Sequence, residues 1–265
     1  MNSFLKWAGS KRKILPKLIS HLPKQFDRYV EPFAGSACLF FALMPKRALL
    51  ADINEELIET YQELRDRPDD VVEELSRFTP TEASYYRVRG LDSTVLSPSG
   101  RAARFIYLNR YCFNGLYRTN KQGRFNVPFG GKRSGRLPSP EFLRECATAL
   151  KKVVLKPTSF EDTLAKVKAG DFVYLDPPYC IRSRRVFNEY SNASFGEEQL
   201  QLLRGHLKRL DRLGIPFLVS YGLSKEAIEL SRGFYSRQLV VQRQIAGFAT
   251  NRRKARELVI TNYQN

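Results

Sequence analysis

Histidine and cysteine are scarce in this chain, and long apolar runs are missing. Its 265 residues include two histidines and four cysteines, and no two cysteines are spaced as CxxC. This scarcity excludes the usual metal-binding patterns, so we expect no metal site and a reduced, cytoplasmic setting. No window approaches the roughly 20 apolar residues of a membrane span. The opening MNSFLKWAGSKRK also lacks the apolar core of a signal peptide.

Acidic residues are outnumbered by basic ones. The chain has 44 Lys and Arg residues against 27 Asp and Glu, which gives a formal net charge of +17. Such an excess is informative about partners rather than about the fold. Nucleic acid is the first candidate partner and an anionic membrane surface the second. A basic, ribosome-like or surface-adhesive protein is also compatible with the charge.

Short apolar runs alternate with helical patterns in the first and last parts of the chain. This alternation predicts an α/β sandwich with a mostly parallel sheet. Strand-then-helix patterns occupy 28–43 and 47–64, strands are expected within 151–157, 170–179, 215–222, 237–245 and 256–263, and helices at 196–210 and 224–232.

The middle of the chain lacks that alternation. It is helix-rich at both ends, and its centre, 114–140, is full of Gly, Asn, Pro and basic residues, which predicts turns or a hairpin. We therefore interpret 58–147 as an insertion, and 1–57 together with 148–265 as the domain that carries it.

Ligands of an open parallel sheet bind beyond the carboxyl ends of its strands, so residues that follow strands matter most. Gly35 in EPFAGSA follows the first strand and allows a ligand to approach the backbone. Asp52 in LLADIN follows the second strand and can accept both hydroxyls of a ribose. Alone, the first could be an ordinary tight turn and the second a helix N-cap. Together they favour a nucleoside cofactor, and the glycine pattern is too short for the NAD fingerprint.

The fourth strand ends in DPPY, residues 176–179. Asp176 and the carbonyl of Pro177 can offer two acceptors to an exocyclic amine on a nucleobase, and this frees the nitrogen lone pair for attack. Pro178 stiffens the segment, and Tyr179 supplies a flat face for a planar base. The alternative is a strand-ending turn with a capping aspartate, which does not account for all four residues.

Six motifs in this order resemble the DNA adenine-N6 methyltransferases of the D12 class, and within them the Dam group that modifies GATC. They are FLKWAGSK (4–11), EPFAGSA (31–37), LLADINEELI (49–58), LNRYCFNGLYRTNKQGRFNVPFG (108–130), DPPY (176–179) and RKARELVITNY (253–263). The resemblance covers nearly the whole chain. It implies a Rossmann-like methyltransferase sandwich with an inserted helical and hairpin domain that recognises DNA.

The resemblance also implies S-adenosylmethionine (SAM) as the cofactor. Lys11 is expected near the methionine carboxylate, Asp52 at the ribose, and Ser159 and Phe160 near the adenine, where the family often has Asp-Phe. The full set of expected cofactor residues is Trp7, Gly9, Lys11, Phe33, Gly35, Asp52, Ser159, Phe160 and Asp176. Asp176, Pro177, Pro178 and Tyr179 are expected to form the pocket for a target adenine that has been flipped out of the duplex.

The insert has the composition for reading double-stranded DNA. Arg118 can grip guanine O6 and N7, and Asn114 and Asn120 can read adenine edges or contact phosphates. Phe113 and Leu116 could equally wedge into a base step or pack beneath the hairpin. The resemblance favours DNA contact for both, and implies a thymine methyl for Pro128 and flanking DNA for Lys6.

Basic clusters account for the charge and suggest phosphate contacts with strong salt dependence. They lie in the insert, at Arg182, Arg184 and Arg185, and at Arg252–Arg256. The loop Ile181–Asn192 is expected to order over the flipped base.

Other functions remain open from the residues. The same chemistry could act at another DNA sequence, on an RNA base or on a protein glutamine amide, and a DNA-binding module without activity is a third possibility. GATC depends on the resemblance alone. We expect a monomer associated with the nucleoid in a bacterial or phage setting, and the sequence does not show whether it partners a restriction nuclease.

Overall fold

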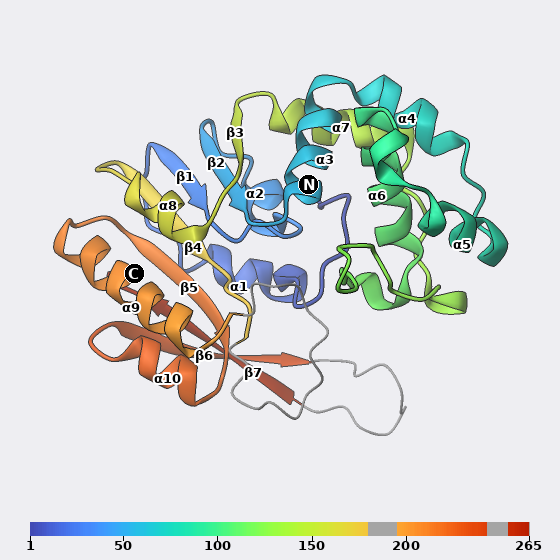
Figure 1. Ribbon diagram of the computed structural model, residues 1–265. Helices are drawn as coiled ribbons and strands as arrows, with labels where there is room; N and C mark the ends of the chain where they lie inside the picture. The colour runs from blue at the N-terminus through green and yellow to red at the C-terminus, as the bar shows by residue number, and fades with distance from the viewer. Residues whose placement is uncertain (180–194, 243–253, 265) are drawn as a thin grey trace.

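The computed structural model describes residues 1–179, 195–242 and 254–264. Within these ranges the chain forms a mixed α/β fold around a seven-stranded sheet of order β3-β2-β1-β4-β5-β7-β6 (Figure 1). Strands β1 to β5 are parallel, and β7 runs antiparallel between β5 and β6. The strands are β1 Arg28–Glu31, β2 Ala48–Asp52, β3 Val153–Pro157, β4 Asp171–Leu175, β5 Phe217–Gly222, β6 Tyr235–Gln242 and β7 Lys254–Thr261. The predicted α/β class with a mostly parallel sheet is confirmed.

Several helices begin where the sequence supplies a capping side chain. Asn54, Ser159 and Ser224 each accept a hydrogen bond from a backbone N–H of the first turn that follows. The α-helices are α1 Leu15–Ile19, α2 Cys38–Leu43, α3 Glu55–Asp66, α4 Pro68–Ser76, α5 Glu82–Gly90, α6 Pro98–Tyr111, α7 Pro140–Leu150, α8 Phe160–Ala165, α9 Glu197–Arg212 and α10 Lys225–Ser231. Short 3₁₀ turns are η1 Lys11–Ile14, η2 Ser93–Val95, η3 Phe113–Gly115 and η4 Gly131–Arg133.

Alternate residues of the buried strands divide the interior into two cores. In β4, Phe172 and Tyr174 join the core shared with α2, α3 and the insert, whereas Val173 and Leu175 join the core under α8, α9 and α10. Figure 1 shows these helix groups on opposite sides of the sheet. Because both faces of β4 are covered, all five of its residues are buried.

The insert is packed into the first of these cores rather than tethered beside it. Its Val71, Tyr85 and Ile106 belong to the same buried cluster as Phe4 and Tyr29. The predicted division at 57/58 falls inside α3, and that at 147/148 falls inside α7. Helix α3 contacts β2 and β3 as well as α6 and α7. The division into domains stays a prediction.

The centre of the insert forms the expected hairpin. Thr119 pairs with Phe125, and Cys112 pairs with Phe129. The turn between Thr119 and Phe125 is closed by a 2.8 Å hydrogen bond from Asn120 N to the Arg124 carbonyl. The predicted loop Ile181–Asn192 lies outside the described residues. So do Arg182, Arg184, Arg185, Arg252 and Arg253, so the predicted phosphate contacts there stay predictions. Across the described ranges, no helix combines the length and apolarity needed to span a membrane.

Candidate active site

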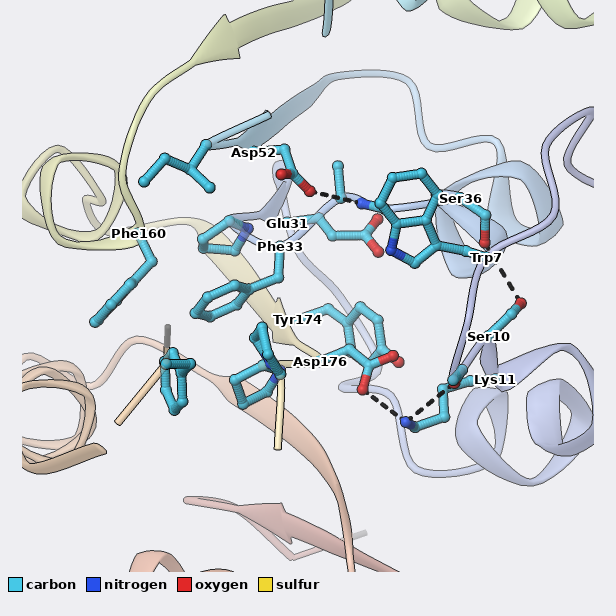
Figure 2. Close-up of a pocket in the computed structure, with 18 of the residues that line it drawn as sticks. Trp7, Ser10, Lys11, Glu31, Phe33, Ser36, Asp52, Phe160, Tyr174 and Asp176 are labelled. Atoms are coloured by element: carbon cyan, nitrogen blue, oxygen red, sulfur yellow. Dashed lines mark hydrogen bonds and ion pairs between the residues drawn. The ribbon is translucent and has the colours of Figure 1, made fainter. Parts of the chain in front are cut away.

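The carboxyl ends of β1, β2 and β4 meet at one cavity of about 550 Å³. Figure 2 shows Asp52, Glu31 and Asp176 following one another along it, with Phe33 and Phe160 on one side and Trp7 on the other. Every residue predicted for the cofactor or the target base lines this cavity: Trp7, Gly9, Lys11, Phe33, Gly35, Asp52, Ser159, Phe160, Asp176, Pro177, Pro178 and Tyr179. Their shared position does not test the role proposed for each.

Gly35 allows the backbone of the first loop to pass directly beneath the Trp7 indole. Its φ is +45°, and a Cβ placed there would lie 2.8 Å from the indole Cδ1. Asp52 fixes the loop, since one carboxylate oxygen accepts from Gly35 N at 2.9 Å and the other from Asn54 N at 3.0 Å. The hydroxyl of Tyr61 donates to the Gly35 carbonyl at 2.8 Å. The loop is therefore held from both sides.

Three aromatic rings form the opposite end of the cavity. Phe33 and Phe160 stack with centroids 5.2 Å apart, and Phe195 meets both at 6.0 Å. These rings offer a flat, apolar surface to a planar group. Ser159 also lines the cavity, but its hydroxyl caps α8 by accepting from Asp162 N and also donates to the Asp162 carboxylate. Its oxygen is thus already engaged in the structure.

Asp176 is anchored by an ion pair across the cavity floor. The Lys11 ammonium lies 2.7 Å from one Asp176 carboxylate oxygen and 3.7 Å from the buried carboxylate of Glu257 in β7. It also donates to the Gly9 carbonyl at 3.3 Å (Figure 2). Lys11 was expected at the methionine carboxylate of the cofactor. In the structure its ammonium is bonded to Asp176, and its role at the cofactor stays a prediction.

Burial is the largest single cause acting on the pKa of each of these groups. It raises the pKa of Asp176, while the charge and hydrogen bond of Lys11 lower it and the Glu257 charge raises it. Burial alone would lower the pKa of Lys11, but the carboxylates of Asp176 and Glu257 outweigh it and raise that pKa. Burial also raises the pKa of Glu31, against a hydrogen bond that Tyr29 donates to it at 2.9 Å. Lys11 is therefore a firmly charged partner for Asp176.

Tyr179 presents its ring at the mouth of the cavity and is 43% exposed. It packs edge to face on Tyr221 at 5.3 Å. A Cβ on Gly222 would lie 3.0 Å from the Tyr179 ring, so glycine allows this close approach. The hydroxyl of Tyr221 donates to the Pro178 carbonyl at 3.4 Å. Pro177 is buried, while Pro178 and Tyr179 are exposed.

The residues predicted to contact DNA cluster on the hairpin and on η3. Phe113 and Asn114 are exposed, and Asn114 has φ +55°. Leu116 is half-buried against the core, which favours packing beneath the hairpin for this residue. Pro128 is exposed, and its carbonyl accepts from Phe113 N at 2.9 Å.

Three further predicted DNA residues already have internal partners. The Arg118 guanidinium donates to the Asn126 side chain at 2.7 Å. Asn120 accepts from the backbone N–H groups of Gln122 and Arg124, both at 3.0 Å, and so shapes the turn. The side chain of Lys6 packs against Gly115 and Gly135.

Sequence reasoning missed several groups around the cavity. Glu31 ends β1 directly before the proline of EPF, and a carboxylate at the end of a buried strand is a usable signal. Phe195 and Gln199 flank the start of α9 and carry no such signal. Glu257 reaches the site from the last strand. In the described part of the chain, no group of three or more His, Cys, Asp or Glu is arranged to hold a metal ion.

Comparison with known proteins places this geometry in a family. The model of the D12 class N6 adenine-specific DNA methyltransferases matches residues 7–245. The Type II methyltransferase M1.LlaDCHI of Lactococcus lactis subsp. cremoris is 33% identical over 100% of this chain and 96% of its own length. The DNA adenine methylase of Escherichia coli (strain K12) is 35% identical over 97% of this chain and 94% of its own. The Retron Ec67 DNA adenine methylase of Escherichia coli is 33% identical over 98% of this chain and 90% of its own length. The chain thus belongs to the D12 class of N6 adenine-specific DNA methyltransferases.

Proposed function

We propose that the protein transfers a methyl group from S-adenosylmethionine to N6 of an adenine flipped out of duplex DNA, within GATC. The observation that carries the proposal is the continuity of one cavity. It joins the loop of Gly35 and Asp52 to the segment of Asp176, Pro177 and Tyr179. A nucleoside held by the first part faces a base held by the second.

The residues present fit the cofactor. Asp52 can accept from ribose hydroxyls, and the apolar surface formed by Phe33, Phe160 and Phe195 suits one face of an adenine ring. Trp7 and Gly9 remain for the methionine end, with Lys11 close by. S-adenosylmethionine, when bound, supplies a methyl group already activated on a sulfonium. The task left to the chain is to position the attacking amine and to exclude water.

Asp176 and the Pro177 carbonyl would each accept a hydrogen bond from one N–H of the adenine amine. This draws the nitrogen toward a tetrahedral shape and stabilises the positive charge that develops on it. Lys11 supports that role because its charge and hydrogen bond lower the pKa of Asp176 and so oppose the effect of burial. The Tyr179 ring would stack on the flipped base, whose extrusion costs a few kcal/mol. The methylated amine then loses its proton to water or to Asp176.

The hairpin would read the flanking sequence. We propose that Arg118 grips guanine, that Asn114 and Asn120 contact base edges or phosphates, and that Pro128 touches a thymine methyl. Phe113 is the better placed of the two wedge candidates, because it is exposed whereas Leu116 is packed. Lys6 would contact DNA beside the site. The insert, 58–147, serves as the recognition domain, and 1–57 with 148–265 as the catalytic domain.

The alternatives differ in substrate rather than in site. Methylation of another DNA sequence is supported by the relatives, since proteins named Type II methyltransferase and DNA adenine methylase are about equally similar at 33% and 35% identity. RNA is a weaker candidate than duplex DNA, because the long basic insert lies beside a cavity that would hold one base flipped out of a duplex. A silent DNA-binding module would not need the paired Asp176 and Lys11. We propose that the protein acts as a monomer on the nucleoid of a bacterial or phage-infected cell.

The test uses labelled S-adenosylmethionine and two short duplexes that differ only in carrying GATC or GTAC. N6-methyladenine in the GATC duplex alone, identified by nucleoside mass spectrometry, supports the whole proposal. Equal methylation of both duplexes keeps the chemistry and rejects the recognition sequence. No transfer to either, with the cofactor bound, rejects the recognition sequence and turns attention to other sequences, to RNA and then to a DNA-binding module without activity.

A further inference from the structure

The backbone around Trp7 is bonded to the insert. Lys6 N donates to the side-chain oxygen of Asn109 in α6 at 2.8 Å, and the Asn109 amide donates back to the Lys6 carbonyl at 2.7 Å. Asn109 is buried. Two reciprocal bonds to the backbone of one residue fix the two peptide groups that lead into Trp7. This wall of the cavity therefore moves with α6.

The Trp7 indole lies between the recognition hairpin and the cofactor loop. One face stacks on Tyr117 of the hairpin, with centroids 6.0 Å apart and planes at 15°. The indole also covers Gly35. A Cβ at this position would lie less than 3 Å from the indole, so only glycine allows so close an approach. A single ring thus connects the hairpin to the backbone that borders the cavity.

Tyr117 is itself held firmly. Its hydroxyl donates to the Glu56 carboxylate of α3 at 2.7 Å, and its ring packs against Phe105 at 5.5 Å and Phe125 at 5.8 Å. It directly precedes Arg118, whose guanidinium bonds across the hairpin to Asn126. If DNA binding draws Arg118 away from Asn126 and shifts the hairpin backbone, Tyr117 transmits that shift to the indole stacked on it.

We propose that Tyr117 is a positioning residue that couples the recognition hairpin to the cofactor cavity through Trp7, with Asn109 fixing the intervening backbone. This inference depends on the function proposed above. Coupling of this kind is reciprocal, so cognate DNA tightens cofactor binding by the factor by which the cofactor tightens DNA. Such factors are typically about 5–150-fold.

The test measures the dissociation constant of S-adenosylmethionine with and without saturating GATC duplex. Trp7 is the only tryptophan in the chain, so its fluorescence reports on the indole directly. Tyr117→Leu and Tyr117→Met remove the stacked ring, and Tyr117→Phe keeps it while losing the bond to Glu56. Two ring-free variants guard against one that fails to fold, which circular dichroism would show.

In the unaltered protein and in Tyr117→Phe, we expect cognate DNA to tighten cofactor binding by at least about fivefold and to change the Trp7 emission. In the ring-free variants, the ratio of the cofactor dissociation constants without and with cognate DNA should approach one. The KM for S-adenosylmethionine on cognate DNA should rise by a larger factor than kcat falls. A ring-free variant that keeps the full factor overturns the inference, as does a factor of one in the unaltered protein. Absence of methyl transfer by the unaltered protein overturns the proposed function instead.

Discussion

The cavity and the hairpin engage their polar groups in different ways. In the cavity, the side chains proposed for chemistry are bonded to one another or to backbone, as Asp52 is to Gly35 and Asp176 to Lys11. On the hairpin, Phe113, Asn114 and Pro128 are exposed, although Arg118 and Asn120 form hydrogen bonds within it. Chemistry requires groups fixed before the substrate arrives, whereas recognition requires groups left open to a partner. Substitutions in the two regions should therefore affect different measurements.

The largest effect is expected at Asp176. Asp176→Asn keeps the shape of the side chain but removes the charge and one acceptor for the amine. We expect kcat to fall by at least about 10²–10³-fold, with the dissociation constant of the cofactor little changed. Single-turnover methyl transfer and equilibrium binding measure the two. Equal losses in both would mean that Asp176 serves the cofactor rather than the reaction.

Arg118 tests the other side of the comparison. Arg118→Ala should cost about 1–3 kcal/mol of discrimination between GATC and a duplex with its guanine replaced. The turnover rate on saturating GATC should change far less. Lys121→Ala, at the exposed tip of the same hairpin, is the matched control. It should weaken binding to all duplexes alike and reduce the salt slope by about one. Unchanged discrimination in Arg118→Ala would remove this residue from the reading surface.

Gly35→Ala tests whether the cofactor loop depends on the close approach of Trp7. The left-handed backbone alone penalises alanine by roughly 1–2 kcal/mol, and the added Cβ would meet the indole. We expect cofactor affinity to fall by at least about tenfold. Gly205→Ala lies in α9 with open space around it, and should leave binding intact. Normal affinity in Gly35→Ala would show that the indole can move aside.

The charges around Asp176 predict opposite shifts in pH dependence. Asp176 must be ionised to act, and its raised pKa places the acid limb of kcat/KM above the usual aspartate value of about 3.9. Lys11→Gln removes a cation, raises this pKa further and moves the limb to higher pH. Glu257→Gln removes an anion, lowers the pKa and moves the limb to lower pH. Shifts in the same direction would show that another group controls the limb.

The smallest effect concerns Ala37, which directly precedes α2 with φ +48°. Ala37→Gly relieves that conformation but loses a buried methyl group worth about 0.8 kcal/mol. Ala34→Gly, at a buried position without a positive φ, loses the methyl with no relief. Ala37→Gly should therefore be less destabilising by about 1 kcal/mol, measured by urea unfolding. Equal losses would mean that Ala37 is not strained.

The sequence predicts the cavity well because a parallel sheet brings the ends of its strands together. Gly35, Asp52 and Asp176 lie far apart in the chain, yet each lies at or after the end of a strand. The strands are neighbours in the sheet, so their ends bring the three residues together. The hairpin is similarly signalled by its glycines and asparagines. The contacts of Arg118 and Asn120 within it are not, since the same side chains suit both a turn and a DNA base.

What the sequence does not show is pairing between distant segments. Glu257 reaches Lys11 because β7 lies beside β5, an order that no local pattern specifies. The stack of Trp7 on Tyr117 likewise joins the first residues to the insert. The burial of Leu116 depends on how closely the hairpin lies against the core. Each depends on tertiary contacts, which hydrophobic periodicity cannot specify.

The position of β7 also affects how the protein must be made. Strand β7 pairs with β5 on one side and with β6 on the other. Strand β5 also pairs with β4, whereas β6 lies at the edge of the sheet with β7 as its neighbour. A nascent chain that has not yet released residues 254–261 from the ribosome exposes an unpaired edge on β5 and leaves β6 without a sheet. Glu257 is missing from beside Lys11 at that stage. The contact between Lys11 and Glu257 therefore forms only once this strand has joined the sheet.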